Sequence, residues 1–304
     1  MPYINVNDAY ILDNTGKQVD DAVDYALANS NRNLLDNPFF TVNQRNFTSS
    51  TATNNIYSVD RWYIARGTGT ISKTSNGITI NGVGASRETT FQQMIDCGDL
   101  TGRTVTLSVN DGGTIRQITG VAPARTTSNN IFIRFTLRDG VSAFLYAMAT
   151  SSAYAYMLQF QVNAGYTLDL RAAKIELGSY STLANDVPPD YKTELDKCKW
   201  YFKRIKSQLT YDPVGYGIQG SSDRAYIKRP GQMRVAPTPS FVGTLRLVGN
   251  ATASADVTHL TVGGTDAEGI VVLANTAAGS LTSAHTYTMY LGGTTSYIDL
   301  SADL

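Results

Sequence analysis

The chain has 304 residues, only 16% of them charged, and its 25 Lys and Arg balance its 25 Asp and Glu to a formal net charge of zero. Nucleic acids and anionic membranes both recruit basic surfaces, so this balance argues against either as a partner. The length exceeds that of one β-sandwich and predicts two compact domains with a short additional segment. Because proteins near zero net charge tend to associate, the composition also favours an oligomer.

The amino terminus has neither the basic start nor the apolar core of a signal peptide. Nowhere does an apolar run approach the roughly 18 residues that cross a bilayer. We therefore expect a chain that is made in the cytoplasm and does not insert into a membrane. Cys97 and Cys198 lack metal-ligand spacing, and we expect both to be small buried residues.

Residues 1–32 are predicted to form an extended arm and one short helix. Thr15 and Gln18 have the spacing of a capping box, and an apolar stripe follows them. The stripe consists of Val19, Ala22, Val23 and Ala26. Because a helix this short needs a partner surface, we expect an oligomer or attachment interface here. A helix lying on its own domain is the alternative.

From residue 33 to 187 the apolar residues alternate as they do in β-strands. One face of the segment Ile131–Leu137 is wholly apolar, and Asp139-Gly140 then predicts a tight turn. The apolar phase slips near Ala172, which predicts a β-bulge. About eight strands without interleaved helices predict an antiparallel sandwich of jelly-roll type.

Residues 188–206 are predicted to form a linking helix with Asp190 as its N-cap. Its apolar seam has heptad-like spacing and comprises Tyr191, Leu195, Cys198, Phe202 and Ile205. The seam either closes the end of the sandwich or associates with itself about a symmetry axis.

Residues 207–304 are again β-rich, with little charge, and predict a second, smaller β-sandwich. The candidate strands are 224–229, 233–238, 245–248, 257–262, 269–273, 287–291 and 296–300. Gly215–Gly220 matches the dinucleotide-binding string G-x-G-x-x-G, but the chain continues as a strand where that motif needs a helix. The whole chain is therefore predicted to be all-β, with a short N-terminal helix and one amphipathic linking helix.

The sequence offers little for catalysis. His259 and His285 have no nucleophile or further ligand at a diagnostic spacing. The acidic residues that could serve as paired glycosidase carboxylates are scattered without a motif: Glu88, Asp96, Asp99, Glu176, Asp186 and Glu268. We expect no catalytic residue, no metal and no cofactor, and so a protein that is not an enzyme. A polysaccharide depolymerase is the less favoured alternative.

Binding of a neutral glycan has more support, because aromatic rings stack on the C–H faces of sugars and amides and hydroxyls complete the contacts. Tyr211, Tyr216 and Tyr226 stand near Gly-rich turns and are the candidate carbohydrate-binding residues. Packing or a protein interface is the alternative for each. Trp62 and Trp200 have apolar neighbours, and we expect both in cores.

Two signatures bracket the first β-rich stretch. They comprise Asn33–Phe40, Asn43–Arg45, Tyr57 with Asp60–Trp62, Ile175–Gly178 and Tyr191–Ile205. In this order they resemble the jelly-roll domains, similar to carbohydrate-binding modules, of tail-fibre, head-fibre and other appendage proteins of tailed bacteriophages. Two further segments, 233–238 and 298–304, look like the carboxy-terminal modules of phage fibres.

The resemblance implies a structural virion protein, a homotrimer that presents carbohydrate-binding-like domains for adhesion to the host surface. It also implies attachment to other virion proteins through residues 1–32 and localisation in the virion after synthesis in the host bacterial cytoplasm. Pro38 stands where Gly is common in such proteins, and no long shaft segment is present, which favours a compact spike or head fibre. A capsid or tail decoration or adaptor protein that binds no glycan is the alternative.

Overall fold

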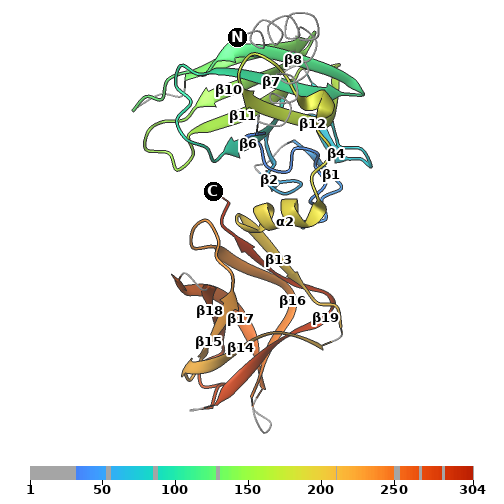
Figure 1. Ribbon diagram of the computed structural model, residues 1–304. Coiled ribbons are helices and arrows are strands. Elements are labelled where there is room, and N and C mark those ends of the chain that lie inside the picture. The colour runs from blue at the N-terminus through green and yellow to red at the C-terminus, as the bar shows by residue number, and fades with distance from the viewer. Residues whose placement is uncertain are drawn as a thin grey trace, which may run out of the picture. The chain divides into compact units, whose positions relative to one another are not determined.

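The computed structural model describes residues 32–52, 56–84, 88–127, 131–209, 211–249, 254–266, 269–282 and 285–303 (Figure 1). These residues form two compact units. Unit 1 holds the described residues up to Asn43 together with Phe47–Pro189, and unit 2 holds Gln44–Asn46 together with the chain from Asp190 onward.

Unit 1 is an antiparallel sandwich of two sheets. The first sheet contains, in spatial order, β1 (Ser49–Thr51), β4 (Thr70–Lys73), β5 (Ile78–Asn81), β12 (Thr167–Leu177), β7 (Thr104–Asp111) and β8 (Thr114–Val121). The second contains β2 (Ile56–Tyr57), β3 (Tyr63–Arg66), β6 (Thr89–Ile95), β11 (Tyr156–Val162), β10 (Val141–Ala147) and β9 (Ile131–Arg138). A short 3₁₀ helix, η1 (Leu183–Asn185), follows β12. The buried apolar residues of both sheets make one continuous core.

The first signature of the sequence folds into this core. Trp62 is fully buried, and its ring stacks on that of Phe91 at a centroid distance of 5.0 Å and an interplanar angle of 10°. The indole Nε1 of Trp62 donates a hydrogen bond to the backbone oxygen of Asn37 at 3.1 Å. Asn37 has a φ of 49°, a conformation that Asn tolerates, and its side-chain amide donates to the backbone oxygens of Val42 and Asp60. These residues therefore hold the core together.

Several local predictions for unit 1 are confirmed. Gly140 has a φ of 68° in the turn between β9 and β10. The register of β12 against β7 shifts between Leu170 and Ala172, where the sequence predicts a bulge. The described part of unit 1 has two six-stranded sheets where the pattern indicates about eight strands, because strands of two to four residues are too short to show a period of two.

A buried carboxylate links the two sheets of unit 1. Asp111, at the end of β7, accepts hydrogen bonds from Arg138 of β9 at 2.6 Å and from Arg116 of β8 at 3.1 Å. Its other oxygen accepts from the backbone N–H of Asp169 at 3.2 Å. Burial raises the pKa of Asp111, but the hydrogen bonds from Arg138 and Arg116 outweigh burial, so this pKa lies below its ordinary value.

Replacing Asp111 with Asn is expected to destabilise unit 1 at neutral pH by about 1–3 kcal/mol, since hydrogen bonds to charged groups contribute amounts of this size. Because the folded pKa is lowered, the contribution is fully present well above the unfolded pKa of about 3.9 and is lost as the pH falls through the folded pKa. Urea unfolding of the wild type and of Asp111→Asn should therefore differ at pH 7 and converge in acid. Asp169→Asn, whose carboxylate pairs with Arg171 at a part-exposed position, is the control. A difference that does not shrink on acidification contradicts this role of Asp111.

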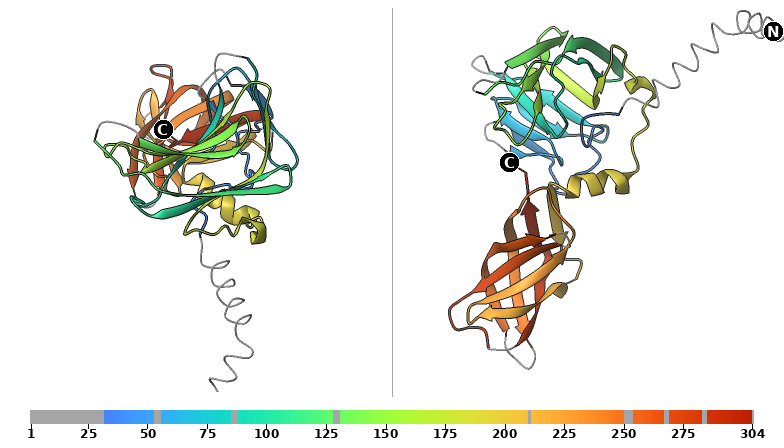
Figure 2. Two further views of the ribbon diagram at one scale, coloured as in Figure 1. Left: turned by 90° about the horizontal axis from the view of Figure 1, so that it is seen from above. Right: turned by 60° about the vertical axis from the view of Figure 1, so that its left-hand side comes forward.

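Unit 2 is one antiparallel sheet that closes on itself (Figure 2). Its strands follow the order β13 (Phe202–Lys206), β19 (Thr286–Ser301), β14 (Tyr211–Ser221), β15 (Arg224–Pro230), β18 (Gly269–Thr276), β17 (Ser254–Asp266) and β16 (Thr238–Gly249). β16 then pairs with β19 from Thr238 opposite Ser301 to Gly249 opposite Tyr287, which completes the ring.

The all-β fold predicted for the chain is confirmed. In unit 2 the two sheets expected of a small sandwich are two halves of one closed sheet. The strand β19 is long enough to contribute to both halves. The sequence indicates two strands over β19, at 287–291 and 296–300, because Gly292 and Gly293 interrupt the apolar alternation between them.

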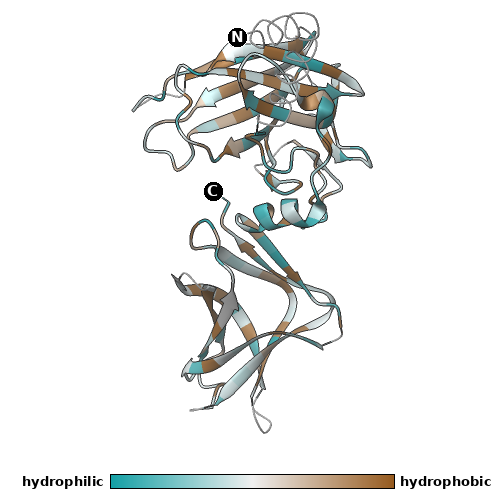
Figure 3. Ribbon diagram, in the orientation of Figure 1, coloured by the Kyte–Doolittle hydropathy of each residue, from teal (hydrophilic) through white to brown (hydrophobic). Residues whose placement is uncertain are grey.

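The one α-helix of the described chain is shorter than the sequence predicts. α2 spans Tyr191–Lys199, and Asp190 is its N-cap as predicted, accepting a hydrogen bond from the backbone N–H of Thr193 at 3.0 Å. The predicted helical seam is wrong beyond Lys199, because Phe202 and Ile205 lie on β13 and pair with β19. Figure 3 shows that α2 is largely hydrophilic. Pairing of Phe202–Lys206 with the long strand β19 is therefore favoured over continuation of the helix, whose heptad-like seam has few apolar residues.

Two further predictions for unit 2 are wrong. Residues 233–238 do not form a strand, and only Thr238 belongs to β16. Pro237 has no backbone N–H to donate to a neighbouring strand, which accounts for the break. Trp200 is 40% exposed and lies outside any core, whereas Trp62 is buried as predicted.

Unit 2 also includes the end of the Asn43–Arg45 signature. The guanidinium of Arg45 lies 3.5 Å from the centroid of the Phe202 ring, and its Nη2 lies 2.5 Å from Asp303 Oδ2. Arg204 donates two hydrogen bonds to the carboxylate of Asp299, at 2.6 and 2.5 Å. These stacked and paired arginines fix Gln44–Asn46 on the β13 edge of the sheet.

Candidate functional site

A tyrosine-rich face lies on the outside of the closed sheet. Met289 and Leu291 of β19, like Leu245 and Leu247 of β16, belong to the core of unit 2, so their neighbours along each strand point outward. We call the outward set the tyrosine face. It consists of Tyr211, Tyr216 and Ile218 of β14, Thr286, Thr288 and Tyr290 of β19, and Arg246 and Val248 of β16.

Strand register brings these side chains together. Tyr216 lies opposite Thr288, and Thr288 lies opposite Val248, so the three form one row across β14, β19 and β16. Tyr290 lies opposite Arg246 in a parallel row. Tyr211 is 63% exposed and Tyr216 70% exposed. Phenol rings this accessible, held on a closed sheet, are available to a partner without rearrangement of the backbone.

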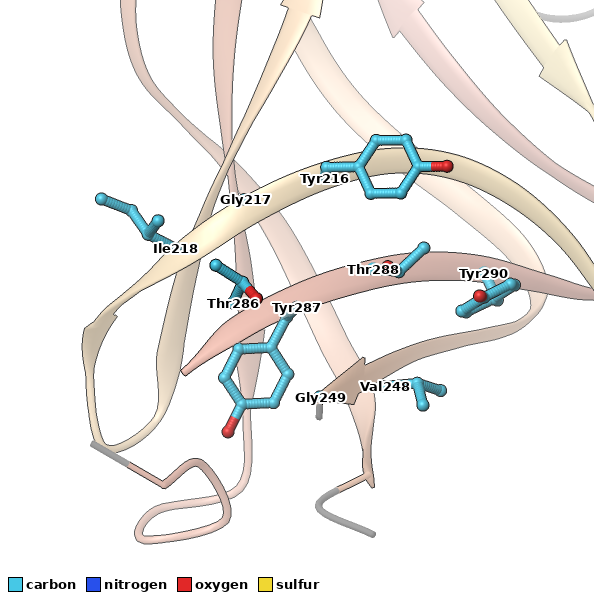
Figure 4. A pocket seen from close by; sticks show the side chains of 9 residues that line it. All are labelled: Tyr216, Gly217, Ile218, Val248, Gly249, Thr286, Tyr287, Thr288 and Tyr290. Atoms are coloured by element: carbon cyan, nitrogen blue, oxygen red, sulfur yellow. The ribbon is translucent and has the colours of Figure 1, made fainter. Parts of the chain in front are cut away.

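Two adjoining hollows lie on this face. The larger has a volume of about 550 Å³ and is lined by Tyr216, Gly217, Ile218, Val248, Gly249, Thr286, Tyr287, Thr288 and Tyr290 (Figure 4). The smaller has a volume of about 370 Å³ and is lined by Tyr211, Arg246, Val248, Ser254 and Tyr290. Val248 and Tyr290 line both, so the hollows are neighbours. Their volumes lie within the range of about 300–1,000 Å³ that is usual for small-molecule sites.

The tyrosine face carries one cation, and that cation is paired. Arg246 Nε lies 2.7 Å from Asp256 Oδ1, and both side chains are largely exposed. The hydrogen bond with Asp256 raises the pKa of Arg246, and the same bond lowers the pKa of Asp256. The face is therefore electrically neutral at physiological pH, and its chemistry is ring stacking and hydrogen bonding.

A glycine permits the close packing beneath Tyr216. A Cβ at Gly217 would lie 1.8 Å from the backbone oxygen of Tyr226 on the neighbouring strand β15. Any side chain at Gly217 would thus push β14 away from β15 and displace the rings that line the larger hollow.

The structure brings two of the three predicted tyrosines together. Tyr216 lines the larger hollow and Tyr211 the smaller, whereas Tyr226 lies opposite Ile218 and lines neither. Sequence reasoning missed Val248 and Tyr290. The signal that could have found them is the apolar alternation, in which Tyr290 lies between the core residues Met289 and Leu291 and Val248 follows the core residue Leu247.

The predicted interface on the N-terminal helix lies outside the described residues. It comprised Val19, Ala22, Val23 and Ala26. Glu268, one of the scattered carboxylates, also lies outside the described part of the chain.

Two of the remaining carboxylates meet, at a buried lysine of unit 1. Lys174 Nζ lies 2.8 Å from Asp186 Oδ1 and 3.7 Å from Glu176 Oε2, and Thr182 bridges the lysine and Glu176. Glu176 is fully buried, so this carboxylate is inaccessible to a polysaccharide. Within the described residues there is no cluster of three or more His, Cys, Asp and Glu side chains that could hold a metal.

Comparisons with known proteins found no matching family model, no matching curated protein and no matching solved structure. In the part of the chain that the structure describes, no helix has the length and apolarity to span a membrane.

Proposed function

We propose that this chain is a structural appendage protein of a tailed bacteriophage virion, without enzymatic activity, that adheres to saccharide on the host surface through its tyrosine face. It assembles as a homotrimer and attaches to other virion proteins through residues 1–32, as a compact spike or head fibre. The observation that carries the adhesive role is the pair of adjoining hollows lined by tyrosine rings and threonine hydroxyls. The virion assignment is supported by the resemblance in the sequence.

The chemistry of the tyrosine face supports a neutral sugar as its ligand. Phenol rings such as those of Tyr216 and Tyr290 cover the C–H face of a pyranose, and the hydroxyls of Thr286 and Thr288 can both donate and accept hydrogen bonds. Tyrosine loses little conformational freedom on binding, because it has two side-chain torsions and here stands on a strand. Arg246 is neutralised by Asp256, so an anionic ligand has no unpaired cation to bind on this face.

Replacing Tyr216 and Tyr290 together with Ala is expected to weaken binding to a cognate bacterial surface polysaccharide by about ten-fold or more. Each lost ring removes about 0.5–1.5 kcal/mol of stacking beyond its area, and about 1.4 kcal/mol corresponds to ten-fold in affinity. The measurement is binding of the purified full chain to an array of bacterial polysaccharides, followed by titration of the best hit.

Tyr180→Ala is the matched control, since Tyr180 is 66% exposed, close to the exposure of Tyr216, but lies in unit 1. This variant should bind like the wild type. Equal binding by the wild type and by the double variant would remove the tyrosine face from the proposal, and a wild type that binds no polysaccharide would remove adhesion altogether.

A structural role without glycan binding is the second candidate, and one observation favours it. Ile218 is 63% and Val248 37% exposed on the same face, and contiguous exposed aliphatic side chains mark protein interfaces. If the tyrosine face is a contact between subunits, the double variant will dissociate the oligomer, as measured by native mass spectrometry.

Immunogold labelling with an antibody to the chain tests the virion assignment separately, and virions without label would contradict it.

A further inference from the structure

The outer face of the second sheet of unit 1 carries aromatic, glutamine and methionine side chains that do not belong to the core. Phe91, Leu145, Leu158 and Phe160 of this sheet belong to the core, so the residues between them point away from it. Register places the outward residues in two rows, which together we call the glutamine face. The first row is Phe144, Gln159, Gln92, Tyr63 and Tyr57, and the second is Phe132, Tyr146, Met157 and Met94.

Aromatic rings stand at both ends of the first row. At one end the rings of Tyr57 and Tyr63 meet edge to face at a centroid distance of 5.0 Å. At the other, Phe132 contacts Phe144 at 5.4 Å and Tyr146 at 5.1 Å. The row crosses five strands, so its ends lie roughly 19 Å apart at the usual spacing of neighbouring strands. That span suits an extended chain and exceeds a single small molecule.

Two glutamines occupy the middle of the row, directly opposite each other on β11 and β6. Gln159 is 6% exposed, and its Nε2 has no hydrogen-bond acceptor within the described residues. A buried amide N–H without an acceptor lowers the stability of the fold. An oxygen atom supplied by a ligand would satisfy it. Surface side chains change rotamer on the picosecond to nanosecond timescale, fast enough to open the path to this nitrogen.

Charged side chains flank the glutamine face but belong to neither row: Arg66 and Glu88, which are of opposite sign, both act on Tyr146. Neither row contains an ionisable carboxylate or amine. Arg134 borders the first row beside Phe144, and its guanidinium already donates to Ser142 Oγ at 2.9 and 3.2 Å. A partner that matches this face must be uncharged along its length, offer apolar C–H surface to rings at both ends, and offer oxygen acceptors between them.

We propose that the glutamine face is a second binding site, which holds an extended, uncharged stretch of a saccharide chain. The exposed ring of Phe132 at one end and the half-buried rings of Tyr57 and Tyr63 at the other stack on sugar C–H faces, and the Gln159 and Gln92 amides bind hydroxyl and ring oxygens between them. The chemistry rests on the sheet of unit 1 alone, while a bacterial surface polysaccharide as the source of the chain rests on the proposed function. A second copy of this protein is the other occupant, and the test below distinguishes it by a change of oligomeric state.

The test uses the full chain and the variant Gln159→Met, which removes the amide and nearly preserves the volume of the side chain. A ligand-binding glutamine predicts opposite effects on binding and on stability. Affinity for the polysaccharide should fall about ten-fold, while the melting temperature of unit 1 should rise by about 2–4 °C because an unsatisfied donor is gone. The probes are arrayed bacterial polysaccharides together with cellohexaose, maltohexaose and chitohexaose, measured by titration calorimetry.

Phe132→Ala is the second variant, since Phe132 is 50% exposed and its loss cannot collapse the core; it should weaken binding without changing the melting temperature. Tyr180→Ala is again the control. If Tyr216→Ala/Tyr290→Ala abolishes binding while Gln159→Met and Phe132→Ala leave it intact, this site is disproved and the proposed function stands. Binding that survives the tyrosine-face variant and is lost in Gln159→Met supports this site. No binding by the wild type, or a change of oligomeric state in Phe132→Ala, would overturn it.

Discussion

Replacing Trp62 with Ala is expected to lower the free energy of unfolding of unit 1 by about 3–5 kcal/mol, the range found when a buried large aromatic residue is truncated. Trp62 is fully buried, stacks on Phe91 at 5.0 Å and contacts the ring of Phe40 at 5.1 Å. The substitution removes these contacts and leaves the backbone oxygen of Asn37 without its indole donor. Typical domains are stable by only about 5–15 kcal/mol, so the substitution should remove a large share of the stability of unit 1.

The measurement is urea denaturation followed by circular dichroism, with hydrogen exchange of β6 and β11 peptides as the local report. Trp200→Ala is the matched control, because Trp200 is 40% exposed and its loss should cost less than about 1 kcal/mol. In Trp62→Ala the remaining tryptophan, Trp200, reports on unit 2 through its fluorescence. If both variants lose the same amount of stability, the core role of Trp62 is refuted.

The contrast between these tryptophans shows where sequence patterns suffice. Trp62 lies between Val59 and Ile64, which join the same core, and the sequence predicts its burial from such apolar neighbours. Trp200 follows a helix that the sequence extends too far, since a heptad-like spacing over Tyr191–Ile205 does not reveal that β19 competes for Phe202 and Ile205. Local alternation therefore predicted the longer strands of unit 1 and the bulge near Ala172, but it did not predict the shortest strands or the pairing between distant segments.

The candidate sites show the same limit. Tyr211 and Tyr216 could be named because tyrosines near Gly-rich turns are candidates for exposure, whereas Tyr290 joins them only through the register of β14 with β19. The glutamine face was invisible to the sequence for the same reason. Gln92 and Gln159 are 67 positions apart and become neighbours only when β6 pairs with β11. The alternation along a strand decides which face of the sheet a glutamine occupies. The pairing of strands decides which residues lie beside it.

Replacing Lys174 with Met is expected to destabilise unit 1 by about 3–5 kcal/mol, the usual cost of removing one partner from a buried ion pair. Lys174 is 2% exposed and Glu176 fully buried. The ammonium donates to Thr182 Oγ1 at 2.5 Å and to Asp186 Oδ1 at 2.8 Å, and Thr182 Oγ1 in turn donates to Glu176 Oε2 at 2.7 Å. Without Lys174 the carboxylate of Glu176 keeps its hydrogen bonds from Thr182 but loses the only cation that these contacts bring within 4 Å.

The second variant, Lys174→Met/Glu176→Gln, separates the penalty of a stranded charge from the loss of packing. The amide oxygen that this variant introduces would still accept from the backbone N–H of Thr182, as Glu176 does at 2.8 Å, but the side chain would carry no charge. The double variant should therefore be more stable than Lys174→Met alone, with a coupling of about 1–3 kcal/mol in the double-mutant cycle measured by urea denaturation. Lys199→Met is the control, because its pair with Asp196 is exposed and should contribute less than about 1 kcal/mol. Additive effects at Lys174 and Glu176 would mean that the charge of Glu176 is solvated by water once Lys174 is removed. The carboxylate would then be accessible to solvent, which contradicts its burial at the end of β12.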